Sequence, residues 1–110
     1  MKKTKLGEFE EMVLLAVILL KEEAYGVEIK KELESKLNET VSVGSIQNSL
    51  KRMEEKGFLS SEFGEATKQR GGKRKRFYTA TPQGQSVLEE MRAVRTKFYE
   101  AIPAIATSES

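Results

Sequence analysis

The 110-residue sequence contains no cysteine, no histidine and no tryptophan, and only two prolines. Without cysteine there is neither a disulfide framework nor a thiolate ligand, and without histidine the common zinc sites are excluded too. The commonest general base and the nucleophile pairs that depend on histidine are also missing. Since no convincing carboxylate pair or phosphate-binding motif stands out, we expect no metal, no cofactor and no enzymatic activity.

Long hydrophobic runs are also absent. The apolar run at residues 12–20 is too short to span a bilayer. Glu8, Glu10 and Glu11 precede it, which is the wrong flank for a signal peptide. We interpret the run as a buried helix and expect a cytoplasmic protein. With 38% hydrophobic and 33% charged residues, the composition is typical of one soluble globular domain.

A net charge of +2 conceals one strongly basic segment, residues 68–76 (KQRGGKRKR). It contains no acidic residue and six basic ones, namely Lys68, Arg70, Lys73, Arg74, Lys75 and Arg76. The rest of the chain has thirteen basic against seventeen acidic residues, a charge of −4. Such a focused basic cluster attracts polyanions, although taken alone it is equally consistent with a solvated loop that has no partner.

Apolar spacing and turn residues predict four helices and one hairpin. The predicted helices cover residues 7–21, 26–37, 44–56 and 82–101, and the predicted strands cover residues 58–63 and 76–80. Residues 22–26 are predicted as a turn, and residues 41–43 as an extended linker or a very short strand. A loop with three glycines separates the two strands.

Several residues mark where these elements begin and end. Ser42 and Thr81 are candidate N-caps, and Pro82 suits the first position of the last helix. Gly57 suits a left-handed helix end. Strand alternation puts Arg74, Arg76 and Tyr78 on one face and Lys75 and Phe77 on the other. One of the two aromatic residues must then pack on the core, and we expect it to be Phe77.

This order of elements predicts a mainly α protein with a small β-hairpin, an α+β fold of the winged helix-turn-helix type. The DNA-binding domain would cover residues 1–80, an added dimerisation helix residues 81–103 and a flexible tail residues 104–110. DNA readers of this type insert a helix into the major groove and reach the neighbouring backbone with the hairpin loop.

The helix over residues 44–56 has the side chains that a recognition helix needs. Ile46, Leu50 and Met53 form its inward stripe, which leaves Asn48, Lys51, Arg52 and Glu55 outward and Ser45 and Gln47 on the flanks. Asn, Gln and Arg make paired hydrogen bonds with base edges, while Lys51 and Ser45 suit phosphate oxygens. Any amphipathic helix has an exposed polar face, so the prediction depends on the basic hairpin nearby. The predicted DNA contacts are Ser45, Gln47, Asn48, Lys51, Arg52, Arg70, Gly71, Gly72, Lys73, Arg74 and Arg76.

The last helix carries an apolar stripe formed by Val87, Met91, Val94, Phe98 and Ile102, which Ile105 continues weakly beyond Pro103. The first four are spaced like the seam of a coiled coil. The helix either folds back on the helix over residues 7–21 of its own chain or contacts a second subunit. We favour a homodimer contact that involves both helices. A two-fold dimer would place its recognition helices about 34 Å apart, one turn of DNA.

Three stretches resemble the PadR family of transcriptional regulators. These are LGEFEEMVLLAVILL, EEAYGVEIKKELE and VSVGSIQNSLKRMEEKGFLSSEFGEATKQRGGKRKRFYTATPQG, within residues 5–90. The resemblance implies a dimeric winged-helix repressor of an inverted-repeat operator, in the short subfamily with a single C-terminal helix. Some members release DNA when a small molecule binds. Gln47 stands where many members carry tyrosine, and no tryptophan is present for the drug stacking known in the subfamily.

Two other functions remain open from the residues. A winged helix can be a protein-interaction module that never contacts DNA, which would leave the basic segment as surface charge. It can also bind RNA or DNA without sequence preference. Salt-dependent binding to a duplex distinguishes a DNA reader from a protein-interaction module. Comparison of binding to unrelated duplexes and to RNA distinguishes it from a binder without sequence preference.

Overall fold

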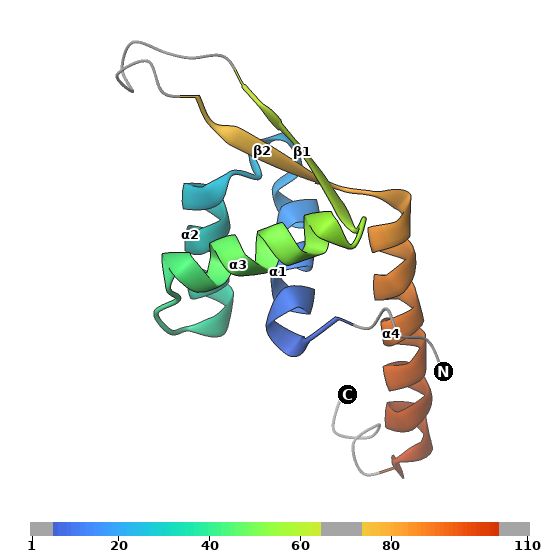
Figure 1. The fold of residues 1–110 in the computed structure, drawn as a ribbon. Helices are drawn as coiled ribbons and strands as arrows, with labels where there is room; N and C mark the ends of the chain where they lie inside the picture. Colours follow the sequence, from blue (N-terminus) through green and yellow to red (C-terminus); the bar gives the residue numbers. More distant parts are fainter. Residues whose placement is uncertain (1–5, 65–73, 104–110) are drawn as a thin grey trace.

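A computed structural model describes residues 6–64 and 74–103 of the chain. The elements, in chain order, are α1 (Glu8–Leu20), the short 3₁₀ helix η1 (Lys21–Glu23), α2 (Gly26–Leu37), α3 (Val43–Glu55), β1 (Leu59–Phe63), β2 (Arg76–Ala80) and α4 (Pro82–Ala101). In Figure 1, α1, α2 and α3 gather beneath the hairpin and α4 stands to one side. The fold is therefore mainly α with one small antiparallel hairpin, as the sequence predicts.

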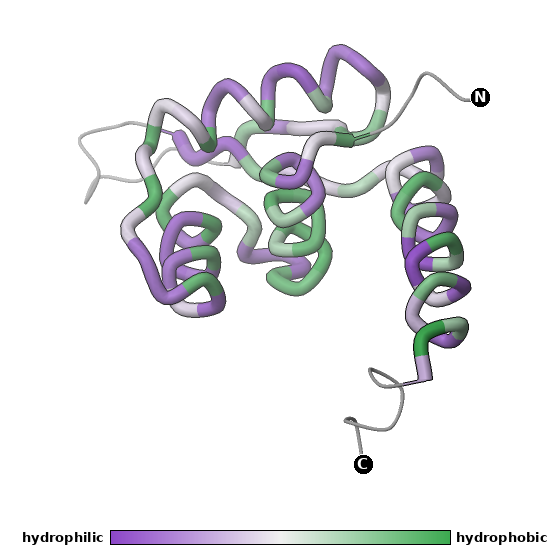
Figure 2. The backbone as a smooth tube through the Cα atoms, turned by 90° about the horizontal axis from the view of Figure 1, so that it is seen from below, coloured by the Kyte–Doolittle hydropathy of each residue, from purple (hydrophilic) through white to green (hydrophobic). Residues whose placement is uncertain are grey.

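The central element of the core is α1, which contacts α2, α3 and β2. Val13, Leu14 and Val17 are buried there, and Figure 2 shows the helix as hydrophobic along much of its length. A second side of α1 is left uncovered by its own chain. It presents three exposed apolar side chains, Leu15, Ile18 and Leu19.

Local capping interactions set the helix ends within one residue of the predicted bounds. Ser42 accepts the Ser45 N–H (3.0 Å) at the start of α3, and Thr81 accepts the Gly84 N–H (3.0 Å) at the start of α4. Gly57 has φ 86° just beyond α3, as its predicted role requires. Of the two alternatives for residues 41–43, the extended linker is the one observed, at residues 41–42, and no strand forms, because Val43 already begins α3.

The turn between α2 and α3 is held by Glu34, which the sequence pattern did not single out. Its carboxylate accepts the Val41 N–H (2.9 Å) and the Lys30 ammonium (2.5 Å), and Lys30 also donates to the Val41 carbonyl (2.9 Å). Hydrogen bonds from Lys30 and from the Val41 N–H lower the pKa of Glu34. These hydrogen bonds among Glu34, Lys30 and Val41 fix the path of the chain as it enters α3.

The hairpin pairs Leu59 with Ala80 at one end and Phe63 with Arg76 at the other. A short segment next to it adds to the pairing: Tyr25 bridges Phe77, and the Tyr78 N–H donates to the Ala24 carbonyl (2.9 Å). The sequence predicted only a turn here. Residues 24–25 are too short a run to show a strand pattern, and the partner that orders them is about fifty residues away in the sequence.

The expectation that Phe77 packs on the core was wrong. Tyr78 is the buried residue, only 7% exposed, and it shares the core side of β2 with Ala80. Phe77 is half-buried, with its ring edge-on to that of Tyr25 (5.3 Å between centroids). The predicted alternation itself holds. Tyr25 covers the opposite side of the strand, which gives Phe77 a partner there.

Helix α4 packs its apolar residues on the domain through its first half, where Gly84, Val87 and Leu88 are buried and Met91 is half-buried. Farther along, Arg95 still donates to Glu11 of α1 (2.7 Å). The outer end of α4 extends away from the body, and the molecule reaches 56 Å along its longest axis against 30 and 22 Å along the others (Figure 1). Within the described ranges, no helix has the length and apolarity needed to cross a bilayer.

Candidate nucleic-acid interface

Helix α3 has a buried apolar side and an exposed polar side, as predicted. Ile46, Leu50 and Met53 are buried, and Ser49 lies with them. The outer side presents six exposed residues that the sequence singled out: Ser45, Gln47, Asn48, Lys51, Arg52 and Glu55. Amide and guanidinium groups on one exposed helix face are the chemistry that reads base edges in the major groove.

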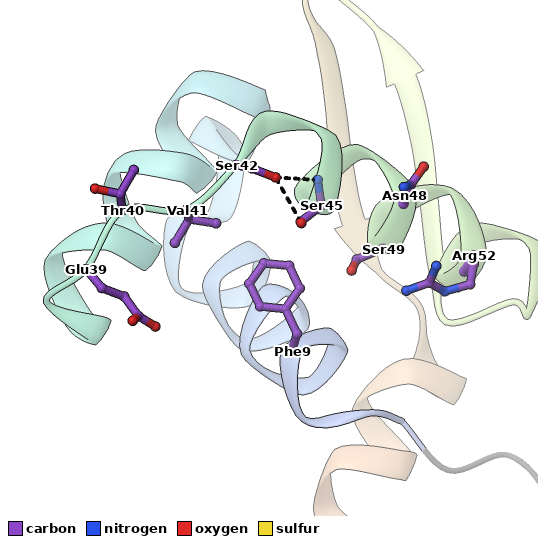
Figure 3. A pocket seen from close by; sticks show the side chains of 9 residues that line it. All are labelled: Phe9, Glu39, Thr40, Val41, Ser42, Ser45, Asn48, Ser49 and Arg52. Atoms are coloured by element: carbon purple, nitrogen blue, oxygen red, sulfur yellow. Dashed lines mark hydrogen bonds between the residues drawn. The ribbon is translucent and has the colours of Figure 1, made fainter.

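An open hollow of about 450 Å³ runs along the start of α3 and the turn before it. Figure 3 shows Phe9 of α1 beneath it and Ser45, Asn48 and Arg52 along its α3 side. The Ser42 hydroxyl donates to Ser45 Oγ (2.9 Å), so the hydroxyl predicted for phosphate contact is part of the helix cap. The hollow brings polar side chains of the turn and of the exposed side of α3 together.

Exposed Arg52 pairs with Glu10 in the first turn of α1. Arg52 donates its Nε–H to Glu10 Oε2 (3.0 Å), and the Lys56 ammonium lies 3.6 Å from Glu10 Oε1. The Gly7 N–H donates to the same Oε1 (2.9 Å). Burial alone would raise the pKa of Glu10, but these hydrogen bonds and the charges of Lys56 and Arg52 outweigh it and lower that pKa. Sequence reasoning missed this residue, because it lies 42 positions from Arg52.

The wing is the hairpin of β1 and β2 with the loop between them, and its base is joined to the end of α3 by a closed set of hydrogen bonds. The Ser61 hydroxyl donates to Glu54 Oε2 (2.7 Å). Arg76 donates from Nε to Ser61 (2.9 Å) and from Nη2 to Glu54 Oε1 (3.2 Å). Arg76, predicted to contact DNA, therefore links the hairpin to α3.

Arg74 packs at the same end of the hairpin. Its guanidinium lies 5.5 Å from the centre of the Phe63 ring, and its Nε–H donates to the Gly64 carbonyl (2.7 Å). Arg76 lies 5.2 Å from the same ring. The two predicted arginines thus share one face, and both are exposed. The other predicted wing residues, Arg70, Gly71, Gly72 and Lys73, lie outside the described residues.

The opposite face of the wing approaches the start of α2. The Lys75 ammonium sits 4.0 Å from the centre of the Tyr25 ring. Gln47 reaches the same helix end, since its amide nitrogen would lie 3.5 Å from a methyl group added to Gly26. Lys75 belongs to the basic segment, but strand alternation gave no reason to place it beside α2.

The predicted dimer stripe divides into two parts. Val87 is buried in its own chain and Met91 is half-buried against the same core. Val94, Phe98 and Ile102 are exposed. A contact between subunits would therefore involve the outer half of α4, because its first turns already cover the core of the same chain.

A helix-turn-helix followed by a two-stranded wing defines the winged-helix class of nucleic-acid-binding proteins. The sequence model of the transcriptional regulator PadR-like family matches residues 14–90 of the chain. The chain belongs to this family, whose members are DNA-binding transcriptional regulators and not enzymes.

Solved structures agree with this assignment. A PadR-like transcription factor from Bacteroides fragilis is 25% identical, with a TM-score of 0.73 over 88% of both chains. Two further PadR-family regulators share the fold. The one from Bacillus cereus is 23% identical, with a TM-score of 0.69 over 89% of this chain and 90% of that chain. The one from Eggerthella lenta is 24% identical, with a TM-score of 0.65 over 90% of this chain and 86% of that chain. No curated protein matches the chain in sequence.

Proposed function

We propose that the chain is a sequence-specific repressor that binds an inverted-repeat operator as a homodimer, with DNA contacts from residues 1–80 and dimer contacts from residues 81–103. The observation that carries the proposal is the exposed polar face of α3 next to the basic base of the wing. Hydrogen bonds among Glu54, Ser61 and Arg76 join the two. A recognition helix and a wing held in one relative position can contact a groove and the neighbouring backbone together.

Within α3, the proposed base readers are Gln47, Asn48 and Arg52. Asparagine and glutamine pair with adenine, and arginine with guanine. Lys51, on the same exposed side, suits a phosphate oxygen. Arg74 and the basic wing residues that precede it would add further phosphate contacts, which carry affinity without sequence preference.

The dimer would bury the uncovered sides of α1 and α4. Phe98 is 68% exposed, and Leu19 and Val94 are each more than half exposed. Large apolar side chains grouped on two helices of a small domain are typical of a subunit interface. A two-fold dimer presents its two α3 helices to successive major grooves, which matches an inverted-repeat site.

Repression is proposed from the resemblance to the PadR family, since the residues do not set the sign of regulation. A regulator that reads DNA works where the chromosome is, which we expect to be the cytoplasm.

Duplex binding at two salt concentrations tests the proposal, with DNA from upstream of the protein's own gene and a scrambled duplex of equal length and composition. Tight binding that prefers the upstream DNA and weakens steeply with salt is the expected result. Equal binding to both duplexes would favour a non-specific nucleic-acid binder. No binding to either at low salt would favour a protein-interaction module.

A further inference from the structure

The carboxylate of Glu10 is almost fully buried, yet it faces the helix that we propose reads DNA. Its side chain is 8% exposed, whereas the Arg52 side chain that it binds is 55% exposed. Burying a carboxylate is costly unless charges and hydrogen bonds compensate it. Gly7, Arg52 and Lys56 supply that compensation here, so the pairing with α3 is built into the core.

The pair with Glu10 uses only one side of the Arg52 guanidinium. Glu10 accepts the Nε–H, and among the described residues no acceptor takes the two terminal Nη groups. Those groups form the fork that pairs with O6 and N7 of guanine. Asn48 lies one turn earlier on the same exposed face, so the free fork stands beside a second base reader (Figure 3).

We propose that Glu10 is a positioning residue for DNA recognition: it holds Arg52 by its Nε–H so that the terminal fork meets a base edge. It also keeps Arg52 and Lys56 from pairing with phosphates. This inference rests on the proposed function of α3. Glu10 itself would not contact DNA.

A positioning role for Glu10 differs from a purely structural role in what its loss does to DNA binding. Loss of the carboxylate frees two cations, Arg52 and Lys56, next to the DNA, so binding to unrelated DNA should tighten. The slope of log affinity against log salt concentration should steepen by up to about 1 for each added phosphate contact. At the same time, a mobile Arg52 must be immobilised on binding, which weakens its base contact. Selectivity falls while non-specific affinity rises.

The experiment compares Glu10→Gln with wild type, using a duplex that the wild type selects from a random pool and its scrambled counterpart. The ratio of the two affinities should fall by about 3- to 10-fold, mainly through tighter binding of the scrambled duplex. Glu11→Gln is the matched control. Glu11 is the adjacent buried carboxylate of α1, but it pairs with Arg95 of α4 (2.7 Å), so its loss should leave the ratio unchanged.

A double-mutant cycle with Arg52→Ala decides whether the effect passes through Arg52. In that background Glu10→Gln should no longer lower the ratio. Glu10→Asp, which keeps the charge on a shorter side chain, serves if Glu10→Gln does not fold, and it should also lower the ratio. An unchanged ratio, equal loss of affinity for both duplexes, or a full effect without Arg52 would each overturn the inference while leaving the proposed function intact. A wild type without any preference would overturn both.

Discussion

Gly84 lies where the start of α4 crosses the turn between α3 and β1. A methyl group added there would come within 2.2 Å of the Phe58 carbonyl oxygen, a backbone atom that cannot rotate away. Thr81, the cap of α4, bonds to the same turn by donating to the Gly57 carbonyl (2.6 Å). Glycine at this position lets α4 begin in close contact with the turn that follows α3.

Gly84→Ala should therefore lower the free energy of unfolding by about 1–3 kcal/mol, because the backbone must shift to admit the methyl group. Urea unfolding measures the change. Gly44→Ala is the control, since a methyl group there meets nothing within 4 Å and alanine favours a helix. Its stability should be unchanged or slightly higher. Equal effects of the two substitutions would contradict the close approach at Gly84.

The lowered pKa of Glu10 predicts how its contribution to stability depends on pH. Because the carboxylate is stabilised in the folded state, its contribution is present above the ordinary value of 4.5 and is lost as the pH falls through the lower folded value. The Tm of wild type should exceed that of Glu10→Gln at neutral pH, and the difference should shrink below pH 4.5. A difference that is constant or grows in acid would contradict the ion pair.

At the scale of the elements, the hairpin and α3 act as one unit through Ser61. Its hydroxyl donates to Glu54 and accepts from Arg76, whereas the neighbouring Ser60 points to the other side of β1. Ser61→Ala removes both bonds without a change of charge. We expect duplex affinity to fall by about 2- to 10-fold, the equivalent of one net hydrogen bond, with sequence preference kept.

Ser60→Ala is the control for this change, because Ser60 is exposed and its loss should leave duplex affinity unaltered. Hydrogen exchange of the amides in β2 provides a second readout and should quicken in Ser61→Ala alone. Unchanged affinity and exchange in Ser61→Ala would show that the wing does not depend on this link.

Most of the element bounds were predictable because their signals are local. Ser42, Gly57, Thr81 and Pro82 each act within a few residues of their own position, and apolar spacing supplies the rest. The pairing of Tyr25 with Phe77 and the burial of Tyr78 depend on a segment far away in the sequence. Pattern alone therefore placed β2 correctly but assigned the wrong aromatic residue to the core.

In the candidate site, too, the local features were predictable from the sequence and the long-range contacts were not. Helical spacing was enough to find the exposed polar face of α3. The acidic partners were not predictable, because Glu10 and Glu54 occupy ordinary positions in their helices and gain their roles only when α1 and the wing pack against α3. The predicted contacts at Arg70, Gly71, Gly72 and Lys73 stay predictions.

At the scale of the whole molecule, the outer half of α4 extends beyond the domain with Val94, Phe98 and Ile102 exposed. Phe98→Asp places a charge in the proposed interface and should convert a dimer to a monomer, as measured by sedimentation. Ala93→Asp is the matched control, because this exposed residue lies on a different side of α4 from the apolar stripe and receives the same charge. A Phe98→Asp variant that keeps the wild-type mass would place the interface elsewhere.

Selection of duplexes from a random pool by wild type and by Asn48→Ala tests most directly whether the exposed face of α3 reads DNA sequence. We predict that wild type selects an inverted repeat with half-sites one helical turn apart. Asn48→Ala should lose preference at one base pair in each half-site, at a cost of about 1–3 kcal/mol. Identical sequences selected by both proteins, with equal discrimination at every position, would contradict the reading role of Asn48. If Gln47→Ala and Arg52→Ala also selected the wild-type sequences with equal discrimination, α3 would have no role in reading the sequence.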